Sequence, residues 1–493
     1  MSEAEATAAP EAAPEGKRKP HLGLSYWKLW TASVTSNLGD GIAQIAYPWL
    51  ASAVTRDPVL IALIAVAQRL PWLLFTLPAG VITDRVDRRK IMVSMDVVRT
   101  ILTLGVALAV IASESSLPTP EEIAGGIDIA TNYGLYTVLV VASLLFGFAE
   151  VLRDNAAQTI LPAIVEPEGL EVANGRLWGA EMVTNSFIGP PLGSFLIAFM
   201  FALPFFVDAG TFAIAAALVF LIPGDFRTHK NGSPGKVQWG KEISEGFRWL
   251  WHHPLLRPMA IILGLMNALG MVGFATFVLF AQEVLGVSAF VFALLGTGGA
   301  IGGILGSIAA PKISEKLGSG TSLYVTLIGG AVTSLIVGLA SSWPVVWLMT
   351  TAFTFTAVLW NVITVSLRQT IIPDRLLGRV NSVYRFFAWG MMPIGLAIGG
   401  LIVSTTESAG GRELALRMPW FVAAAAFGVL FIYAAPRLTT AKIEAARTEG
   451  IAAKQADEAT DEHLAELEAA SDAIAEAGIQ SAPPPLDEGD DGD

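Results

Sequence analysis

The sequence predicts an all-α integral membrane protein with twelve transmembrane helices in two six-helix bundles. Of its 493 residues, 53% are hydrophobic and 15% are charged, whereas about a quarter of the residues of a soluble protein are charged. Apolar runs of about 20 residues, the length that crosses a bilayer, recur along the chain. Lys and Arg gather in alternate connections between these runs, as they do on the cytoplasmic side of membrane proteins.

The apolar runs define the expected spans. They cover 27–54, 59–83, 91–113, 135–157, 173–199, 203–223, 255–284, 288–310, 321–341, 343–368, 381–405 and 418–436. The connection 84–90 carries four bases, whereas 114–134 carries four acids and no base. The positive-inside rule therefore places both termini in the cytoplasm, and we expect a multi-pass protein of the bacterial cytoplasmic membrane.

Composition also divides the chain into domains. We expect a disordered cytoplasmic N-terminus at 1–25, one bundle at 26–223, a cytoplasmic central loop at 224–254, the second bundle at 255–437 and an acidic cytoplasmic tail at 438–493. The central loop mixes aromatic and charged residues, which favours a helix on the inner membrane surface. The tail has fifteen acids and three bases and so carries the whole net charge of −12, which predicts a solvated appendage.

A short repeat supports the two-bundle architecture. The pentapeptide Gln158–Pro162 recurs with one change as Gln369–Pro373, and each copy follows the fourth span of its half. Related halves are typical of secondary transporters, which rock around a central site. We therefore expect the chain to have arisen by duplication of a six-helix unit.

The sequence argues against several kinds of chemistry. It has no cysteine, five scattered histidines and no Gly-rich loop followed by Lys-Ser or Lys-Thr. We expect no metal, no cofactor, no nucleic-acid partner and no ATP site, and we do not expect an enzyme.

Charged residues within the spans are the candidate functional residues, because an ionisable group at the bilayer centre costs about 2.5–3.5 kcal/mol. Asp40 lies halfway along the first span between Gly39 and Gly41. We expect it to couple proton or substrate binding to transport. The alternative is a permanent ion pair with Arg69 of the second span, and a pair that breaks when cargo or a proton arrives would satisfy both.

Other charged residues receive secondary roles. We expect Glu150 and Glu181 to line the central cavity and to assist in coupling. Asp96 and Arg99 are three residues apart, so they can pair on one helix face as a structural element. Asp208 is expected to be a cap or an interfacial charge near the outer end of the sixth span.

The loop after the second span resembles a motif of the major facilitator superfamily. It reads Gly80-Val-Ile-Thr-Asp84-Arg85-Val-Asp-Arg88-Arg89, which is similar to the family pattern of Gly, three residues, Asp-Arg, two residues and two bases. The resemblance covers about residues 25–437 and implies the major facilitator fold and secondary transport.

Two further resemblances refine this assignment. Gly189-Pro190-Pro191-Leu192-Gly193-Ser194 is similar to an element of antiporters in the superfamily. Asn37–Gly41 and Leu70–Leu73 look like the branch that contains siderophore exporters and macrolide-efflux proteins. These resemblances imply export rather than uptake.

The loop motif also implies a conformational latch made by Gly80, Asp84, Arg85, Arg88, Arg89 and Asp154. We expect Asp84 to accept hydrogen bonds from the N-terminus of the eleventh helix, near Asn381. Arg88 would pair with Asp154 or Glu150 at the inner end of the fourth helix. The alternative is that the basic residues only anchor the loop to anionic lipid.

We therefore expect a monomeric, proton-coupled secondary transporter that exports small apolar or amphipathic molecules by alternating access. Its partners would be the small-molecule substrate, protons and the lipid bilayer. One alternative is a dedicated siderophore, metabolite or lysolipid carrier. A second is a non-transporting membrane sensor or scaffold.

Overall fold

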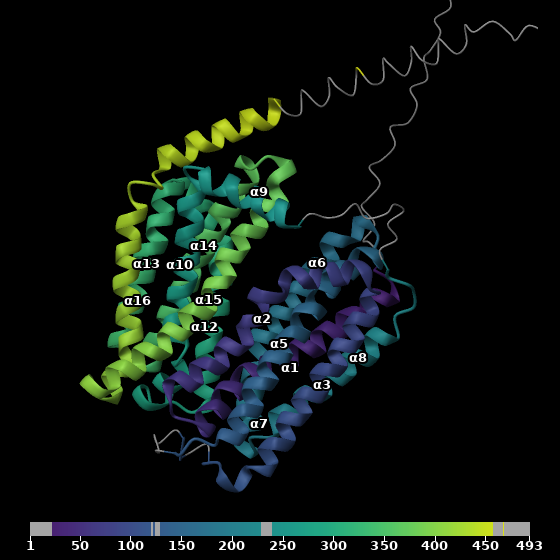
Figure 1. Cartoon of the computed structure of the whole chain (residues 1–493), viewed down its shortest axis with the longest axis vertical. Helices are drawn as coiled ribbons and strands as arrows, with labels where there is room; N and C mark the ends of the chain where they lie inside the picture. The colour runs from purple at the N-terminus through teal and green to yellow at the C-terminus, as the bar shows by residue number, and fades with distance from the viewer. Residues whose placement is uncertain (1–21, 120–121, 124–128, 228–238, 457–466, 468–493) are drawn as a thin grey trace, which may run out of the picture. The chain divides into compact units, whose positions relative to one another are not determined.

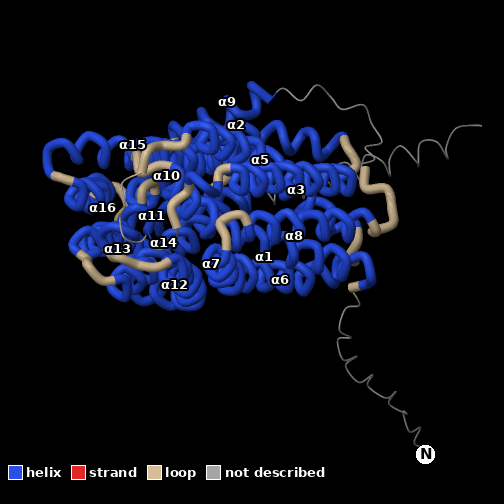
Figure 2. Tube along the Cα trace, turned by 90° about the horizontal axis from the view of Figure 1, so that it is seen from below, coloured by secondary structure: helices blue, strands red, loops and turns tan. Residues whose placement is uncertain are grey.

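The computed structural model describes residues 22–119, 122–123, 129–227, 239–456 and 467. These residues form helices joined by short connections, and no strand occurs among them (Figure 2). The chain divides into two compact units, of which unit 1 comprises 1–233 and 286–296 and unit 2 comprises 234–285 and 297–493. The predicted disordered segment 1–21 and most of the acidic tail lie outside the described residues.

Unit 1 is a bundle of long helices. Its elements are α1 (Gly23–Val54), α2 (Pro58–Arg85), α3 (Arg88–Ala112), α5 (Tyr133–Ile160), α6 (Leu170–Glu181), the π-helical segment η4 (Met182–Ile188), α7 (Gly189–Phe199) and α8 (Leu203–Phe220), with the short 3₁₀ turns η1 (Glu114–Ser116), η2 (Leu161–Ala163) and η3 (Pro167–Gly169). Helix α3 packs against α5 and α8, α2 packs against α5, and α1 packs against α7 and α8 (Figure 1). Helices α1, α3, α5 and α8 thus form a connected group.

Unit 2 contains the second set of helices. They are α9 (Trp239–His252), α10 (Leu256–Phe274), α11 (Phe277–Leu279), the π-helical segment η5 (Phe280–Val284), α12 (Ala289–Leu317), of which the part from Thr297 belongs to this unit, α13 (Ser319–Leu339), α14 (Trp343–Ile371), α15 (Asp374–Gly410) and α16 (Arg412–Ala434). Helix α15 packs against α10, and α13 packs against α14 and α16 (Figure 1).

The predicted membrane spans are confirmed. Among the described residues, 11 helices are long and apolar enough to cross a membrane, and the 32-residue α1 coincides with the remaining predicted span. The fifth predicted span corresponds to α6, η4 and α7. Helix α15 begins at Asp374 rather than at 381, because backbone hydrogen bonding continues through polar residues that a hydropathy profile leaves out.

Small residues let the helices of unit 2 approach closely. A Cβ atom on Gly298 would lie 2.8 Å from the carbonyl oxygen of Trp347, and one on Gly306 would lie 2.8 Å from that of Phe355. The glycines spaced four apart on α12 therefore pack against the backbone of α14. Such small-residue faces provide close packing where lipid supplies no hydrophobic driving force.

The chain after α16 does not behave as a wholly solvated tail. Residues 440–456 form a helix that packs on unit 2. The side chain of Ile443 is fully buried, the Ser319 hydroxyl donates to Glu444 at 3.0 Å, and the Gly320 N–H donates to Thr440 at 3.2 Å. The expectation of a solvated appendage is therefore wrong for 440–456, because the apolar face of this helix is covered by unit 2.

The helix expected in the central loop is present as α9. A Cβ atom on Gly246 would lie 2.8 Å from the carbonyl carbon of Arg379, and Arg379 also forms an ion pair with Glu245. Helix α9 thus packs directly against α15, in addition to any contact with lipid. Phe247 and Trp251 stack on each other with ring centroids 5.4 Å apart and are each 41% exposed.

Asp87 fixes the beginning of α3. Its carboxylate accepts the backbone N–H groups of Lys90 and of Phe226, both at 3.0 Å, and so joins α3 to the segment after α8. Burial alone would raise the pKa of Asp87, but the two N–H groups and the nearby Arg89 hold this pKa below its usual value.

We expect Asp87→Ala to lower the free energy of unfolding at neutral pH by about 1–2 kcal/mol, the usual effect of losing a helix cap. Because folding lowers the pKa of Asp87, its stabilisation is complete above the unfolded-state pKa and disappears as the pH falls through the folded-state pKa. Thermal unfolding in detergent across this range tests the point. Wild type and variant should converge only at acid pH, and equal stability at neutral pH would contradict the assignment.

Candidate functional site

Five charged side chains of unit 1 form a continuous chain of ion pairs across α1, α3 and α5. In spatial order they are Asp40, Arg99, Asp96, Arg153 and Asp154, and we call them the ion-pair chain. Arg99 Nη2 pairs with Asp40, and Arg99 Nη1 lies 3.3 Å from Asp96. Arg153 lies 3.4 Å from Asp96 and 3.5 Å from Asp154. Acids and bases therefore alternate, with an acid at each end.

The two ends of the ion-pair chain are accessible and its middle is not. The side chains of Asp40 and Asp154 are 22% and 35% exposed, whereas those of the three inner members are at most 6% exposed. Three carboxylates against two guanidinium groups leave one negative charge in excess. Because uncompensated charge is costly inside a membrane, a proton on one of the carboxyl groups would complete the balance.

Arg99 is the centre of this arrangement. Its guanidinium carbon lies 3.8 Å from the ring centre of Phe212 in α8 and 4.7 Å from that of Phe146 in α5. Its Nη1 also donates to the hydroxyl of Ser36 at 3.1 Å. The aromatic faces and the hydroxyl favour the charged guanidinium in this position. However, the buried Nε has no hydrogen-bond partner among the described residues.

The structure pairs Asp40 with Arg99 instead of Arg69. Ser36 and Asp40 are four residues apart, so they share one face of α1, and Arg99 bonds to both. Arg69 is exposed on α2 and forms no ion pair with another residue that the structure describes. The expected partner was wrong because the long side chain of Arg99 reaches from α3 to Ser36 and Asp40 on one face of α1, although α2 follows α1 in the sequence.

The interpretation of Asp208 as a cap or an interfacial charge is also wrong. Its side chain is fully buried, and neither carboxylate oxygen has a hydrogen-bond partner among the described residues. A Cβ atom on Gly39 would overlap with Asp208 Oδ1 and with the hydroxyl of Thr211. Gly39 therefore leaves the space on α1 that the Asp208 carboxyl group of α8 occupies.

The Gly-Pro element packs α7 against α1 beside Asp40. A Cβ atom on Gly189 would lie 2.6 Å from the Cα atom of Gly41, and one on Gly193 would lie 2.7 Å from the carbonyl oxygen of Ile42. Pro190, which follows Gly189 at the beginning of α7, is buried. The two backbones thus meet directly at the residues that follow Asp40.

The two predicted cavity acids lie in different surroundings. Glu150 is half-buried one turn before Asp154 on α5, within electrostatic reach of Asp40 and Arg99. Glu181 is exposed and lines a cavity of about 150 Å³. The other residues that line this cavity are Trp178, Met182, Asn185 and Ser186. Glu181 does line a pocket, but no ion pair joins it to the ion-pair chain among the described residues.

The predicted latch is described only in part. Arg88 donates to the carbonyl oxygen of Thr159 at the end of α5 at 2.8 Å, and Arg89 donates to the carbonyl oxygen of Ile222 at 2.6 Å. Gly80 has open space around it, and Arg85 is exposed. Asp154, one expected partner of Arg88, pairs with Arg153. The side chain of Asp84 lies outside the description.

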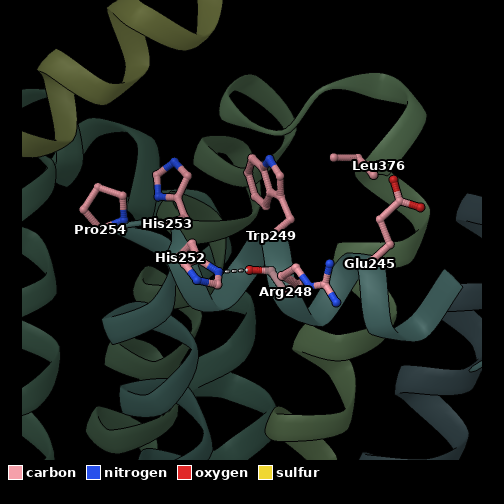
Figure 3. Close-up of a pocket in the computed structure, with 7 residues that line it drawn as sticks. All are labelled: Glu245, Arg248, Trp249, His252, His253, Pro254 and Leu376. Carbon is pink, nitrogen blue, oxygen red and sulfur yellow. Dashed lines mark hydrogen bonds between the residues drawn. The ribbon is translucent and has the colours of Figure 1, made fainter. Parts of the chain in front are cut away.

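A second pocket, of about 500 Å³, lies beside α9 in unit 2 (Figure 3). It is lined by Glu245, Arg248, Trp249, His252, His253, Pro254 and Leu376. His253 Nδ1 accepts the N–H groups of Leu255 and Leu256 at 3.2 and 3.1 Å and so caps α10. Burial lowers the pKa of His253, which favours the neutral ring that can accept these bonds. This pocket contains none of the predicted coupling residues.

Sequence reasoning missed most of the ion-pair chain. The predicted pairing of Asp96 with Arg99 is confirmed. From the sequence, however, this pair received only a structural role within one helix. Arg153 received no role, and Asp208 was placed at the periphery. The available signal was the presence of charges within apolar spans, which marks each of them as costly. The signal could not show which charges from different helices meet.

Comparisons with known proteins agree with this fold. The family model of the Major Facilitator Superfamily matches residues 29–396. The chain is 26% identical over 437 residues to the multidrug efflux pump Tap of Mycolicibacterium fortuitum, covering 86% of this chain and 97% of that protein. It is 22% identical over 371 residues to the enterobactin exporter EntS of Citrobacter koseri, covering 73% of this chain and 80% of that protein.

A solved structure shows the same architecture. The nucleoside transporter NupG superposes with a TM-score of 0.63 at 11% sequence identity, covering 84% of this chain and 99% of that chain. At this identity the likeness concerns the fold alone. The all-helical membrane fold predicted from the sequence is therefore confirmed.

Proposed function

The chain belongs to the major facilitator superfamily, and we propose that it exports small apolar or amphipathic molecules in exchange for protons that bind at Asp40. The observation that carries this proposal is the ion-pair chain of unit 1. It has one more carboxyl group than guanidinium groups, and Asp40 is the half-exposed acid at its α1 end. A proton that arrives at Asp40 would release Arg99 from its partner and change the charge balance of the bundle.

Such a site can link proton binding to a conformational change. A ligand shifts an equilibrium between two conformations only as far as it binds them with different affinities. An ionised Asp40 holds α1 to α3 through Arg99, whereas a protonated Asp40 does not compensate the guanidinium charge. Protonation would therefore weaken the ion pair that joins α1 to α3, next to the place where α7 packs on α1.

The class of cargo follows from the relatives. The most extensive alignment given above is with a multidrug efflux pump, which supports export of varied amphipathic molecules. A dedicated carrier of a catecholate or another metabolite is the second candidate, because an enterobactin exporter is also among the relatives. The cavity at Glu181, Trp178 and Met182 offers an acid beside apolar side chains, and this combination suits a cationic amphipathic molecule better than an anionic one.

The proposal includes an orientation and a latch. Both termini and the basic connections would face the cytoplasm of a bacterial cell, in accordance with the positive-inside rule. Arg88 would act in the latch by holding the beginning of α3 to the end of α5 through the carbonyl oxygen of Thr159.

Asp40→Asn tests the proposed function. In proteoliposomes with an imposed pH gradient, we expect wild type to move ethidium, an amphipathic cation, and expect the variant to lose the gradient-driven component. Asparagine keeps the size of the side chain but cannot exchange a proton. The matched control is Glu171→Gln, which changes an exposed acid at the beginning of α6.

Transport of enterobactin in place of ethidium would favour the dedicated carrier. The proton-coupling assignment is wrong if Asp40→Asn transports either compound at the wild-type rate under every pH gradient.

A further inference from the structure

Asp208 is the buried acid that the ion-pair chain does not use. It lies on α8 one turn before Phe212, the ring that supports the guanidinium group of Arg99. Its carboxyl group is fully buried and both of its oxygens lack a hydrogen-bond partner among the described residues. The Thr211 hydroxyl donates to the backbone carbonyl oxygen of Asp208 at 2.7 Å. An ionised carboxylate in such surroundings would be expensive.

Few titratable groups of the described residues act on Asp208. From α1 they are Asp40 and Tyr47, and from α3 the facing group is Arg99. Helix α7, which also packs against α8, contains no titratable residue. Among the residues that the structure describes, Arg99 is therefore the cation within electrostatic reach of Asp208, and it already pairs with Asp40.

Arg99 and Asp208 are among the described residues that have unfilled hydrogen-bonding atoms. Arg99 has a buried Nε–H without an acceptor, and Asp208 has two buried oxygens without a donor. Unpaired polar groups of this kind are uncommon in folded proteins and call for an explanation. The guanidinium group has five N–H donors in a planar fork, so it can serve a second carboxylate with little movement.

We propose that Asp208 is a second proton-binding group, which exchanges its proton with Asp40 as Arg99 moves from one carboxylate to the other. When Asp40 is ionised and pairs with Arg99, Asp208 carries the proton. When Asp40 gains a proton, Asp208 loses its own and takes over the guanidinium group. One O–H bond forms as another breaks, Arg99 stays charged, and the sum of the charges does not change.

This exchange gives the two acids different tasks. Asp40, whose side chain is 22% exposed, would receive or release the proton, whereas the fully buried Asp208 would keep it away from water. Gly39 lets the Asp208 carboxyl group lie against α1 beside Asp40, since a side chain at position 39 would occupy the space of this carboxyl group. The proposal rests on the proton-coupled function proposed above and adds a storage site to it.

Infrared difference spectroscopy of the purified protein in lipid tests the proposal, because a protonated carboxylic acid has a C=O stretching band that a carboxylate lacks. We expect wild type at neutral pH to show such a band, and Asp208→Asn to lack it, whereas the exposed-acid control Glu171→Gln keeps it. Labelling all aspartates with ¹³C at the side-chain carboxyl carbon should shift the band in wild type. The label thus separates an aspartate band from a glutamate band such as that of Glu150, and the Asp208→Asn and Asp40→Asn variants show which aspartate carries the proton.

The exchange itself is tested in Asp40→Asn, which mimics a permanently protonated Asp40. We expect the aspartate band to disappear in this variant, because Asp208 should ionise and pair with Arg99. A band that persists in Asp40→Asn, or a wild-type protein without an aspartate band, would overturn the proposal. If the aspartate band appears and disappears as expected but the transport rate does not depend on the pH gradient, the proposed function is wrong and the proton exchange between Asp208 and Asp40 is still supported.

Discussion

Arg99→Gln is expected to abolish transport driven by a pH gradient and to lower the free energy of unfolding by about 3–5 kcal/mol. The guanidinium group lies at the centre of unit 1 with a side-chain exposure of 1%, and it compensates both Asp40 and Asp96. Removing it leaves two buried or half-buried carboxyl groups with one remaining cation, Arg153. The uncharged amide of glutamine cannot replace this cation. Thermal unfolding in detergent and ethidium transport in proteoliposomes measure the two effects.

A companion triple variant separates structural from functional loss. Arg99→Met combined with Asp40→Asn and Asp96→Asn removes the charge of Arg99 together with those of its two partners. It leaves Arg153 paired with Asp154. Replacing a buried ion pair by well-packed hydrophobic side chains of similar volume is often neutral for stability. We expect this triple variant to regain most of the stability and none of the proton-driven transport. A stable Arg99→Gln protein with normal transport would show that the ion-pair chain has neither role.

The second large effect is expected from shortening the C-terminus. Removing residues 440–493 should lower the stability of unit 2 by several kcal/mol, whereas removing 457–493 should leave it unchanged. The longer deletion removes Ile443, whose complete burial alone accounts for about 1.5–3 kcal/mol. It also exposes the surface at Gly320 and deprives its N–H group of the Thr440 acceptor.

Comparing the two truncated proteins distinguishes a packed helix from a signalling tail. Thermal unfolding should separate them, and ethidium transport by the protein that ends at residue 456 should equal that of wild type. Loss of transport with 457–493 alone would favour the sensor or scaffold alternative. Equal stability of both proteins would mean that the helix at 440–456 contributes nothing to unit 2.

Much of the fold could be predicted from the sequence because hydrophobicity alone defines the length and number of membrane spans. The predicted span 203–223 and the observed α8, for example, begin at the same residue. The docking of residues 440–456 could not be predicted, since it depends on Gly318 and Gly320 leaving room for Thr440. A composition rich in Ala and Glu suits a solvated helix equally well.

The candidate site, too, could be predicted only in part from the sequence. The position of Asp40 within a span, between two glycines, is visible in the sequence. Its partner is not, because no local pattern shows that Arg99 of α3 reaches the face of α1 that carries Asp40. The role of Gly39 is not visible either, because the structure places the Asp208 side chain of α8 against it. The meeting of residues from non-consecutive helices is a property of the packing and requires coordinates.

The π-helical segment η4 restricts the length of the fifth span. One residue corresponds to about 100° of rotation in an α-helix, and a π-helical turn accommodates an extra residue. Deleting one residue from 182–188 would turn Trp178 and Glu181 by about this angle relative to Gly189 and Gly193. The π-helical segment therefore lets α7 present Gly189 and Gly193 to α1 while the end of α6 borders the cavity at Glu181. Residues 182–188 should thus tolerate substitutions far better than an insertion or a deletion.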